Sequence, residues 1–120
     1  AGATAAGWRT VIVETPRGRV GYDEVGTGRP LLLLHGFPHD RTLWTAQLGD
    51  PPANVRVIAL DLPGFGESDS AEVPSLDHWA DWVAGAMDAL QLPRAIVGGL
   101  SMGGYLAFAL WRRHRARVEG

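Results

Sequence analysis

Three short, mainly apolar runs restrict most strongly what this chain folds into. They occupy residues 31–34, 55–60 and 94–98, and turn-forming Gly or Pro residues flank each of them. An apolar run of this length is too short for a buried helix and is typical of a strand covered on both faces. The runs therefore predict three buried strands.

Helical patterns follow the later strands. Apolar residues recur at three- and four-residue spacing after Ser75, a suitable N-cap, until Pro93 ends the pattern. A second helix, from Met102 to about His114, is apolar on nearly every side, as is typical of a helix pressed into an interior. Strands that alternate with helices predict a mostly parallel sheet with helices on its faces.

The N-terminal segment has a different pattern. Residues 8–14 and 19–24 are rich in β-branched residues and flank a turn at Pro16 and Gly18, which predicts a β-hairpin. The fold class is therefore α/β, with a mostly parallel sheet of about five strands, an N-terminal β-hairpin and flanking helices. Residues 1–7 are small and featureless, and we expect a disordered terminus or a cloning remnant there.

Composition excludes several kinds of chemistry. The chain has no Cys, and all eleven basic side chains are Arg, which excludes disulfides, cysteine nucleophiles and Schiff-base lysines. A formal net charge of −2 disfavours nucleic acid as a partner. No apolar run approaches the length of a membrane span and no signal sequence is visible, so we expect no membrane partner and a cytoplasmic location.

The most specific functional motif is the sequence GLSMG at residues 99–103. It lies where the third apolar strand turns directly into the following helix. Such a turn holds a serine in a strained conformation with its Oγ exposed, and Gly99 and Gly103 let the strand and helix backbones approach closely. Ser101 is therefore the candidate nucleophile. The alternative interpretation is a glycine-rich packing turn with an idle serine.

A second motif, HGFP, follows the first apolar strand. Gly36 lets the chain bend so that the backbone N–H of Phe37 faces a reacting carbonyl, and the N–H of Met102 at the helix start supplies a second donor. Two such donors form an oxyanion hole. The alternative interpretation is a turn in which His35 is buried and hydrogen-bonded.

The sequence DLPGFGESD at residues 61–69 follows the second apolar strand. Its Pro and Gly residues shape a surface loop, and Asp61 and Ser68 are suited to hydrogen bonds with nearby backbone. We interpret this segment as scaffolding rather than as catalytic machinery.

Together, HGFP, DLPGFGESD and GLSMG resemble the motifs of the α/β-hydrolase superfamily, in the same order and at strand ends. The resemblance extends from Val11 to the C-terminus and is greatest to ester, lactone and enol-lactone hydrolases, because dehalogenases and epoxide hydrolases would carry Asp at the position of Ser101. It implies that Ser101 attacks an ester or lactone carbonyl, a base takes its proton, and water cleaves the acyl-enzyme.

In that family the acid and the general-base His follow the nucleophile, and no matching positions follow Ser101 here. Residues 8–120 therefore resemble the N-terminal half of a hydrolase domain. A substitute base is His39, with Asp40 as its one candidate acid, although a solvated loop histidine is the simpler interpretation. His35 and His39 cannot form a helical metal pair across the intervening Gly and Pro, so neither a metal nor a cofactor is expected.

An incomplete domain would leave the strand at residues 94–98 as an exposed apolar edge, which favours pairing with another chain. We expect association, either as a homodimer or with a separate C-terminal half that carries the acid and the base. The rival hypotheses are a catalytically inactive half-domain that acts as a binding or assembly module, and a fragment of a larger hydrolase.

Overall fold

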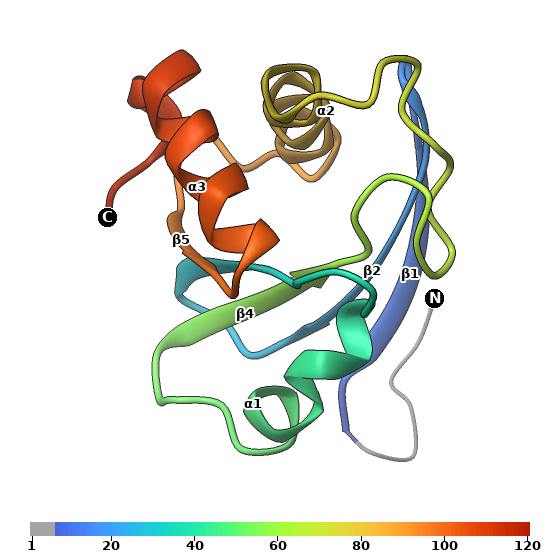
Figure 1. Ribbon diagram of the computed structural model, residues 1–120. Coiled ribbons are helices and arrows are strands. Elements are labelled where there is room, and N and C mark those ends of the chain that lie inside the picture. The colour runs from blue at the N-terminus through green and yellow to red at the C-terminus, as the bar shows by residue number, and fades with distance from the viewer. Residues whose placement is uncertain (1–6) are drawn as a thin grey trace.

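A single mixed sheet organises the computed structural model, which describes residues 7–120 (Figure 1). The terminus predicted at residues 1–7 thus lies, except for Gly7, outside the described residues. The strands are β1 (Arg9–Thr15), β2 (Gly18–Val25), β3 (Arg29–Leu34), β4 (Val55–Leu60) and β5 (Ile96–Gly99). Their order across the sheet is β1-β2-β4-β3-β5. β3 runs parallel to β4 and β5, whereas β2 is antiparallel to β1 and β4. The predicted fold class, with about five strands and an N-terminal hairpin, is confirmed.

Helices cover both faces of the sheet. α2 (Leu76–Ala89) and α3 (Met102–Arg113) lie side by side on one face, and the short helices η1 (Arg41–Trp44) and α1 (Thr45–Gly49) lie on the other (Figure 1). A last 3-10 turn, η2 (Arg115–Arg117), follows α3. The strand in the middle of this arrangement is buried on both sides.

β3 shows this double burial directly. Leu32 and Leu34 belong to the core beneath α2 and α3, whereas Leu33 packs in the smaller core with Leu48 of α1. Alternate side chains of a strand point to opposite faces, so a strand covered on both faces needs apolar residues at every position. The four-leucine run predicted this position in the sheet.

The helix boundaries follow from identifiable residues. The Ser75 Oγ accepts the backbone N–H of His78 at 3.2 Å, which confirms the predicted N-cap of α2. The helix η1 begins after Asp40, whose carboxylate accepts the N–H of Thr42 at 2.9 Å. Sequence periodicity did not predict η1 or α1, because each is too short to repeat an apolar pattern.

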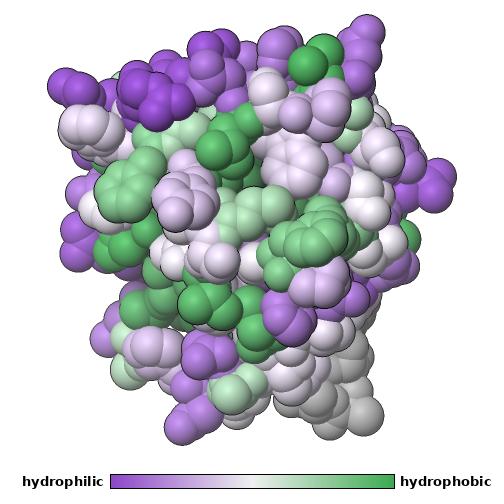
Figure 2. Space-filling model, in the orientation of Figure 1, coloured by the Kyte–Doolittle hydropathy of each residue, from purple (hydrophilic) through white to green (hydrophobic). Residues whose placement is uncertain are grey.

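α3 is buried on one side only. Leu106 and Leu110 are fully buried, but Tyr105 and Phe108 on the other side are exposed, Phe108 to 72%. The prediction that this helix is enclosed on nearly every side is therefore wrong for the outer face. Figure 2 shows that apolar side chains are exposed in the middle of the face that carries α3, and that strongly hydrophilic side chains lie along the upper edge of this face.

The edge of the sheet at β5 is partly covered by the C-terminal segment. The Ala95 N–H donates to the carbonyl of Arg117 at 3.0 Å, the Glu119 N–H to Ala95 at 2.8 Å, and the Val97 N–H to Gly120 at 2.9 Å. Val118 thereby forms a parallel bridge to Ala95. The prediction of an open edge over residues 94–98 is corrected, since the open part begins only beyond Val97. None of the helices formed by residues 7–120 is long and apolar enough to cross a membrane.

Candidate active site

The motifs meet because β3 and β5 are parallel neighbours. Leu34 and Gly99 are register partners at the carboxyl ends of these strands. The Leu100 N–H donates to the Leu34 carbonyl at 3.2 Å, which extends the contact one residue past β5. The loop at residues 35–40 therefore lies beside the turn that carries Ser101.

Ser101 occupies a sharp turn between β5 and α3. Its backbone has φ 82° and ψ −106°, a conformation that L-residues with a side chain rarely adopt. A Cβ on Gly99 would overlap the carbonyl of Gly103, and a Cβ on Gly103 would overlap the carbonyl of Leu34. Both glycines are thus required by close backbone approach, and the serine side chain is exposed at the start of a helix.

The loop after β3, which carries Phe37, lies against the turn that holds this serine. A Cβ on Gly36 would lie 3.0 Å from the carbonyl oxygen of Leu100 and 3.4 Å from the Ser101 Cβ, so the two loops approach too closely for an unhindered side chain at Gly36. Within residues 7–120, no backbone hydrogen bond uses the N–H of Phe37 or of Met102. Both predicted donors are therefore free to donate to a ligand oxygen.

His35 is a buried structural histidine. Its Nε2 accepts the backbone N–H of Leu62 at 2.9 Å, which leaves Nδ1 protonated and within 3.0 Å of the Gly36 carbonyl. Burial lowers the pKa of His35, against smaller opposing contributions from that carbonyl and from Asp61. The side chain thus supports the turn as a neutral imidazole.

The remaining histidines lie in different settings. His39 is exposed, and its ring makes no hydrogen bond to any of residues 7–120. The carboxylate of Asp40 does not contact this ring by a hydrogen bond but caps η1, where it accepts the N–H and the hydroxyl of Thr42. These hydroxyl and backbone hydrogen bonds lower the pKa of Asp40. His78 contacts Ser75 at 2.7 Å, and His114 contacts Asp81 at 2.7 Å. None of the four rings is hydrogen-bonded to Ser101.

A cluster around Arg41 was missed by sequence reasoning. The guanidinium hydrogen-bonds to the carboxylates of Asp61 and Glu67, and its Nε lies 3.0 Å from an oxygen of Asp23 without forming a hydrogen bond. These hydrogen bonds and carboxylate charges raise the pKa of Arg41 although burial, the largest single influence, acts to lower it. Asp61 directly after a buried strand was the one available signal, because a buried carboxylate needs a cation. As predicted, Ser68 bonds local backbone, donating to the Asp61 carbonyl at 2.6 Å.

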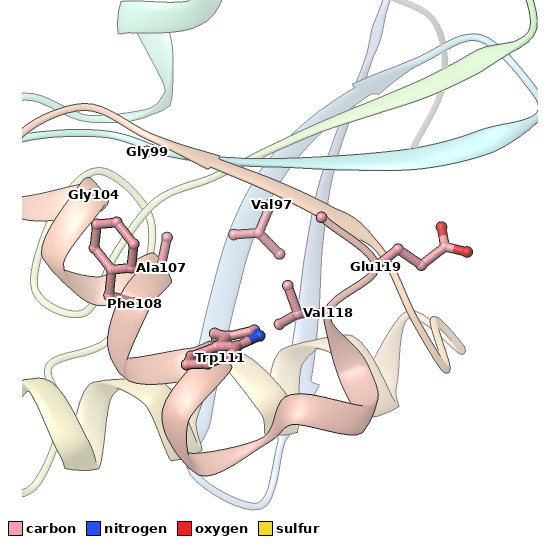
Figure 3. Close-up of a pocket in the computed structure, with 9 residues that line it drawn as sticks. Val97, Gly99, Gly104, Ala107, Phe108, Trp111, Val118 and Glu119 are labelled. Atoms are coloured by element: carbon pink, nitrogen blue, oxygen red, sulfur yellow. The ribbon is translucent and has the colours of Figure 1, made fainter.

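An apolar groove of about 460 Å³ lies beside α3, and Ser101 is not among its lining residues. Val97 of β5, Val118 of the C-terminal segment and Trp111 of α3 converge on it, with Phe108 at its other end (Figure 3). The groove is therefore a separate surface, at the open edge of the sheet. Across residues 7–120, no three His, Asp or Glu side chains are grouped to hold a metal ion.

Comparisons with known proteins agree with this geometry. The chain is 39% identical over 100 residues to the AB hydrolase superfamily protein YisY of Bacillus subtilis. This match covers 82% of this chain and 36% of YisY. It is 33% identical over 115 residues to a haloalkane dehalogenase of Sphingobium indicum, and this match covers 91% of this chain and 39% of the dehalogenase. A thermophilic esterase from Thermogutta terrifontis is similar in structure, with a TM-score of 0.81 and 42% identity over 92% of this chain and 43% of the esterase.

The chain thus spans between 36% and 43% of the length of these relatives. A family model for the alpha/beta hydrolase fold matches residues 29–120, the segment that contains β3, β4, β5 and all of the predicted site residues. By that match and by the relatives above, the chain belongs to the alpha/beta hydrolase fold family.

Proposed function

We propose that the chain carries the nucleophile and oxyanion hole of a serine hydrolase that acts on carboxylic esters or lactones. The observation that carries the proposal is the strained backbone of Ser101 between Gly99 and Gly103. The loop that carries Phe37 lies against this turn, and the N–H groups of Phe37 and Met102 have no backbone partner among residues 7–120, which supports their role as donors. Backbone strain that the surroundings enforce clusters at functional sites. The relatives carry out more than one reaction, and a serine at this position favours acyl transfer.

The chemistry follows from these groups. The Ser101 Oγ attacks the carbonyl carbon while a general base takes its proton, and the carbonyl oxygen becomes an oxyanion. The Phe37 and Met102 N–H groups donate to that oxygen, and the N-terminus of α3 adds a favourable dipole. The protonated base returns its proton to the leaving oxygen as the intermediate collapses, which releases the alcohol and leaves an acyl-serine. Water then attacks this ester while the base accepts the water proton, and the base passes that proton to the Ser101 Oγ as the acid is released.

The general base and its acid come from polypeptide other than residues 7–120 in this proposal. His35 is buried and neutral, while His78 and His114 are bonded to Ser75 and Asp81. His39 stays the substitute candidate, but Asp40 is bonded to Thr42 and does not orient it. A longer parent chain or a partner chain would supply both groups, which the greater length of the relatives supports.

The experiment restores the base chemically. The chain is incubated with p-nitrophenyl acetate and increasing imidazole, a diffusible general base, and the intact protein mass is measured together with the site of acetylation. We expect acetylation at Ser101 that increases with imidazole and is absent from Ser101→Ala. Acetylation that is equal in both proteins, or absent from both folded proteins, would overturn the proposal.

A second candidate function is assembly, and the apolar groove beside α3 favours it. Val97, Phe108, Trp111 and Val118 leave an apolar surface next to the open end of β5. Such a surface favours a second copy of the chain or a complementing C-terminal half. Light scattering on the purified chain distinguishes these two partners, because a homodimer forms without any other polypeptide whereas a complementing half would have to be added. A stable monomer at high concentration would exclude the homodimer, and a folded monomer without imidazole-dependent acetylation would favour an inactive binding module.

A further inference from the structure

Two loops at the carboxyl edge of the sheet are tied together. The loop at residues 35–40 presents the Phe37 N–H, and the loop at residues 61–69 has no role in the proposed chemistry. The Leu62 N–H donates to the ring of His35 at 2.9 Å, and the rings of Phe37 and Phe65 meet edge to face with centroids 5.8 Å apart. A third tie, between Arg41 and Asp61, is the ionic one.

Arg41 is attached to Asp61 by both its backbone and its side chain. The backbone N–H donates to Asp61 Oδ1 at 2.8 Å, and the guanidinium donates to Oδ2 of the same carboxylate. The side chain of Arg41 is only 13% exposed, and Glu67 and Asp23 surround the rest of the guanidinium. Paired donors on one carboxylate fix orientation as well as distance.

Asp61 is a rigid anchor for this contact. Its side chain is fully buried, and its own N–H donates to the Gly21 carbonyl at 2.9 Å, which ties it to β2. The Glu67 N–H donates to Asp61 Oδ2 at 2.9 Å. A Cβ on Gly66, which has φ 53°, would overlap the Asp61 carboxylate. The anchor is therefore held by the sheet and by its own loop.

We propose that Arg41 is a positioning residue for the oxyanion hole, an inference that rests on the proposed serine chemistry. Through its contact with Asp61, Arg41 holds the Phe37 N–H in place. Arg41 follows Phe37 by only four residues, and a donor must lie at hydrogen-bond distance from the developing oxyanion to act. Loosening the tie lets the donor move. The chemical step then slows, whereas binding of the carbonyl compound changes little.

The test compares Arg41→Lys with Arg112→Lys in the full chain. Lysine keeps the charge and the backbone N–H, but its single nitrogen cannot replace the two guanidinium nitrogens that bind Asp61 and Glu67. Arg112 is a matched control, because it pairs with Asp77 on the exposed surface of α2 and α3. Two quantities are measured: the 15N order parameter of the Phe37 amide, and the rate constant and binding constant for phosphonylation of Ser101 by a fluorophosphonate, with imidazole present.

For Arg41→Lys we expect the Phe37 order parameter to fall from about 0.85 toward 0.6. The phosphonylation rate constant should fall about tenfold with an unchanged binding constant, a fraction of the 100-fold or more that loss of a whole donor costs. Arg112→Lys should match the wild type. An unchanged order parameter for Arg41→Lys, or equal falls in both variants, would overturn the positioning role.

Two further outcomes, an unreactive wild type and an unfolded Arg41→Lys variant, also leave the positioning role testable. If the wild type is not phosphonylated at all, the proposed function fails, and the order parameter alone still decides whether Arg41 holds Phe37. If Arg41→Lys does not fold, the double variant Arg41→Met/Asp61→Asn replaces it, because it leaves no unpaired charge at Asp61. The same falls are expected from that variant, and their absence overturns the proposal.

Discussion

The two ends of α3 are built in opposite ways. At its start, Gly103 packs so closely against β3 that no side chain fits, and neighbouring backbone groups hold Ser101 in a strained turn. Toward its end, Phe108 is 72% exposed, and Trp111 lines an open groove. The candidate site therefore depends on contacts made within β3, β5 and α3. The groove side, in contrast, is only partly covered by residues 7–120, with the guanidinium of Arg115 over the ring of Trp111 and Val118 beside it.

The largest expected effect is at the closely packed end. Gly103→Ala would drive a methyl group into the Leu34 carbonyl and should lower the free energy of unfolding by about 4 kcal/mol or prevent folding. Urea unfolding followed by circular dichroism measures this. Gly104→Ala is the matched control, because its Cβ meets nothing closer than 3.5 Å, and it should gain about 0.5 to 1 kcal/mol. Equal effects at the two glycines would refute the close packing.

A smaller effect is expected at His35, on the loop that faces Ser101. His35→Phe keeps a ring of similar shape but leaves the buried Leu62 N–H without its acceptor, which should cost about 1 to 3 kcal/mol at pH 8. Because burial lowers the pKa of His35, the wild type loses stability as the pH falls below the ordinary histidine value of about 6.5. The gap between the two proteins should therefore narrow between pH 7 and 5, and a constant gap would contradict a buried neutral imidazole.

The contact between α2 and α3 should give a still smaller effect. Arg113 holds Asp81 with two hydrogen bonds of 3.0 and 2.9 Å, and with His114 it lowers the pKa of Asp81 to about 2. A carboxylate with a lowered pKa stabilises the fold above its unfolded pKa and loses that effect as the pH falls toward 2. Asp81→Asn should cost about 1 kcal/mol at pH 7, since water screens the pair, and clearly less at pH 2, where about half of the folded molecules carry a protonated Asp81.

Asp88→Asn is the control for that measurement, because Asp88 also pairs with an arginine but is far more exposed. Its cost at pH 7 should be smaller than that of Asp81→Asn. A cost for Asp81→Asn that persists undiminished at pH 2 would show that the ion pair is not its cause.

The smallest effect is expected at the groove. Phe108→Gln removes an exposed aromatic side chain and should change the free energy of unfolding of the dilute chain by less than about 0.5 kcal/mol. At high concentration, light scattering should show less association than in the wild type. A loss of more than about 2 kcal/mol in the dilute chain would mean that Phe108 is packed, and the contrast between the two ends of α3 would disappear.

Sequence patterns predicted the framework because burial controls it. The runs at residues 31–34 and 55–60 became β3 and β4, and Ser75 and Pro93 bound α2 as expected, since each signal is local. The exposure of Phe108 was not predictable from an apolar pattern, which does not reveal whether a helix face has a neighbour. The pairing of the C-terminal segment with β5 was not predictable either, because it depends on backbone hydrogen bonds between residues that are distant in the sequence.

The candidate site was predictable to a similar degree. Gly99, Ser101 and Gly103 have a spacing that backbone sterics demand, so a sequence motif reports them directly. Arg41 was not predictable, because its three carboxylate partners come from β2 and from the loop after β4. Such a cluster exists only once the strands are paired.

The most direct test of the central claim is to map the adduct of a fluorophosphonate probe by peptide mass spectrometry, with imidazole supplied as the base. We expect a single adduct on Ser101, which forms at a rate that increases with imidazole and is absent from Ser101→Ala. Modification of a different residue, or no modification of the folded wild-type chain, would contradict the claim that this turn presents a catalytic nucleophile.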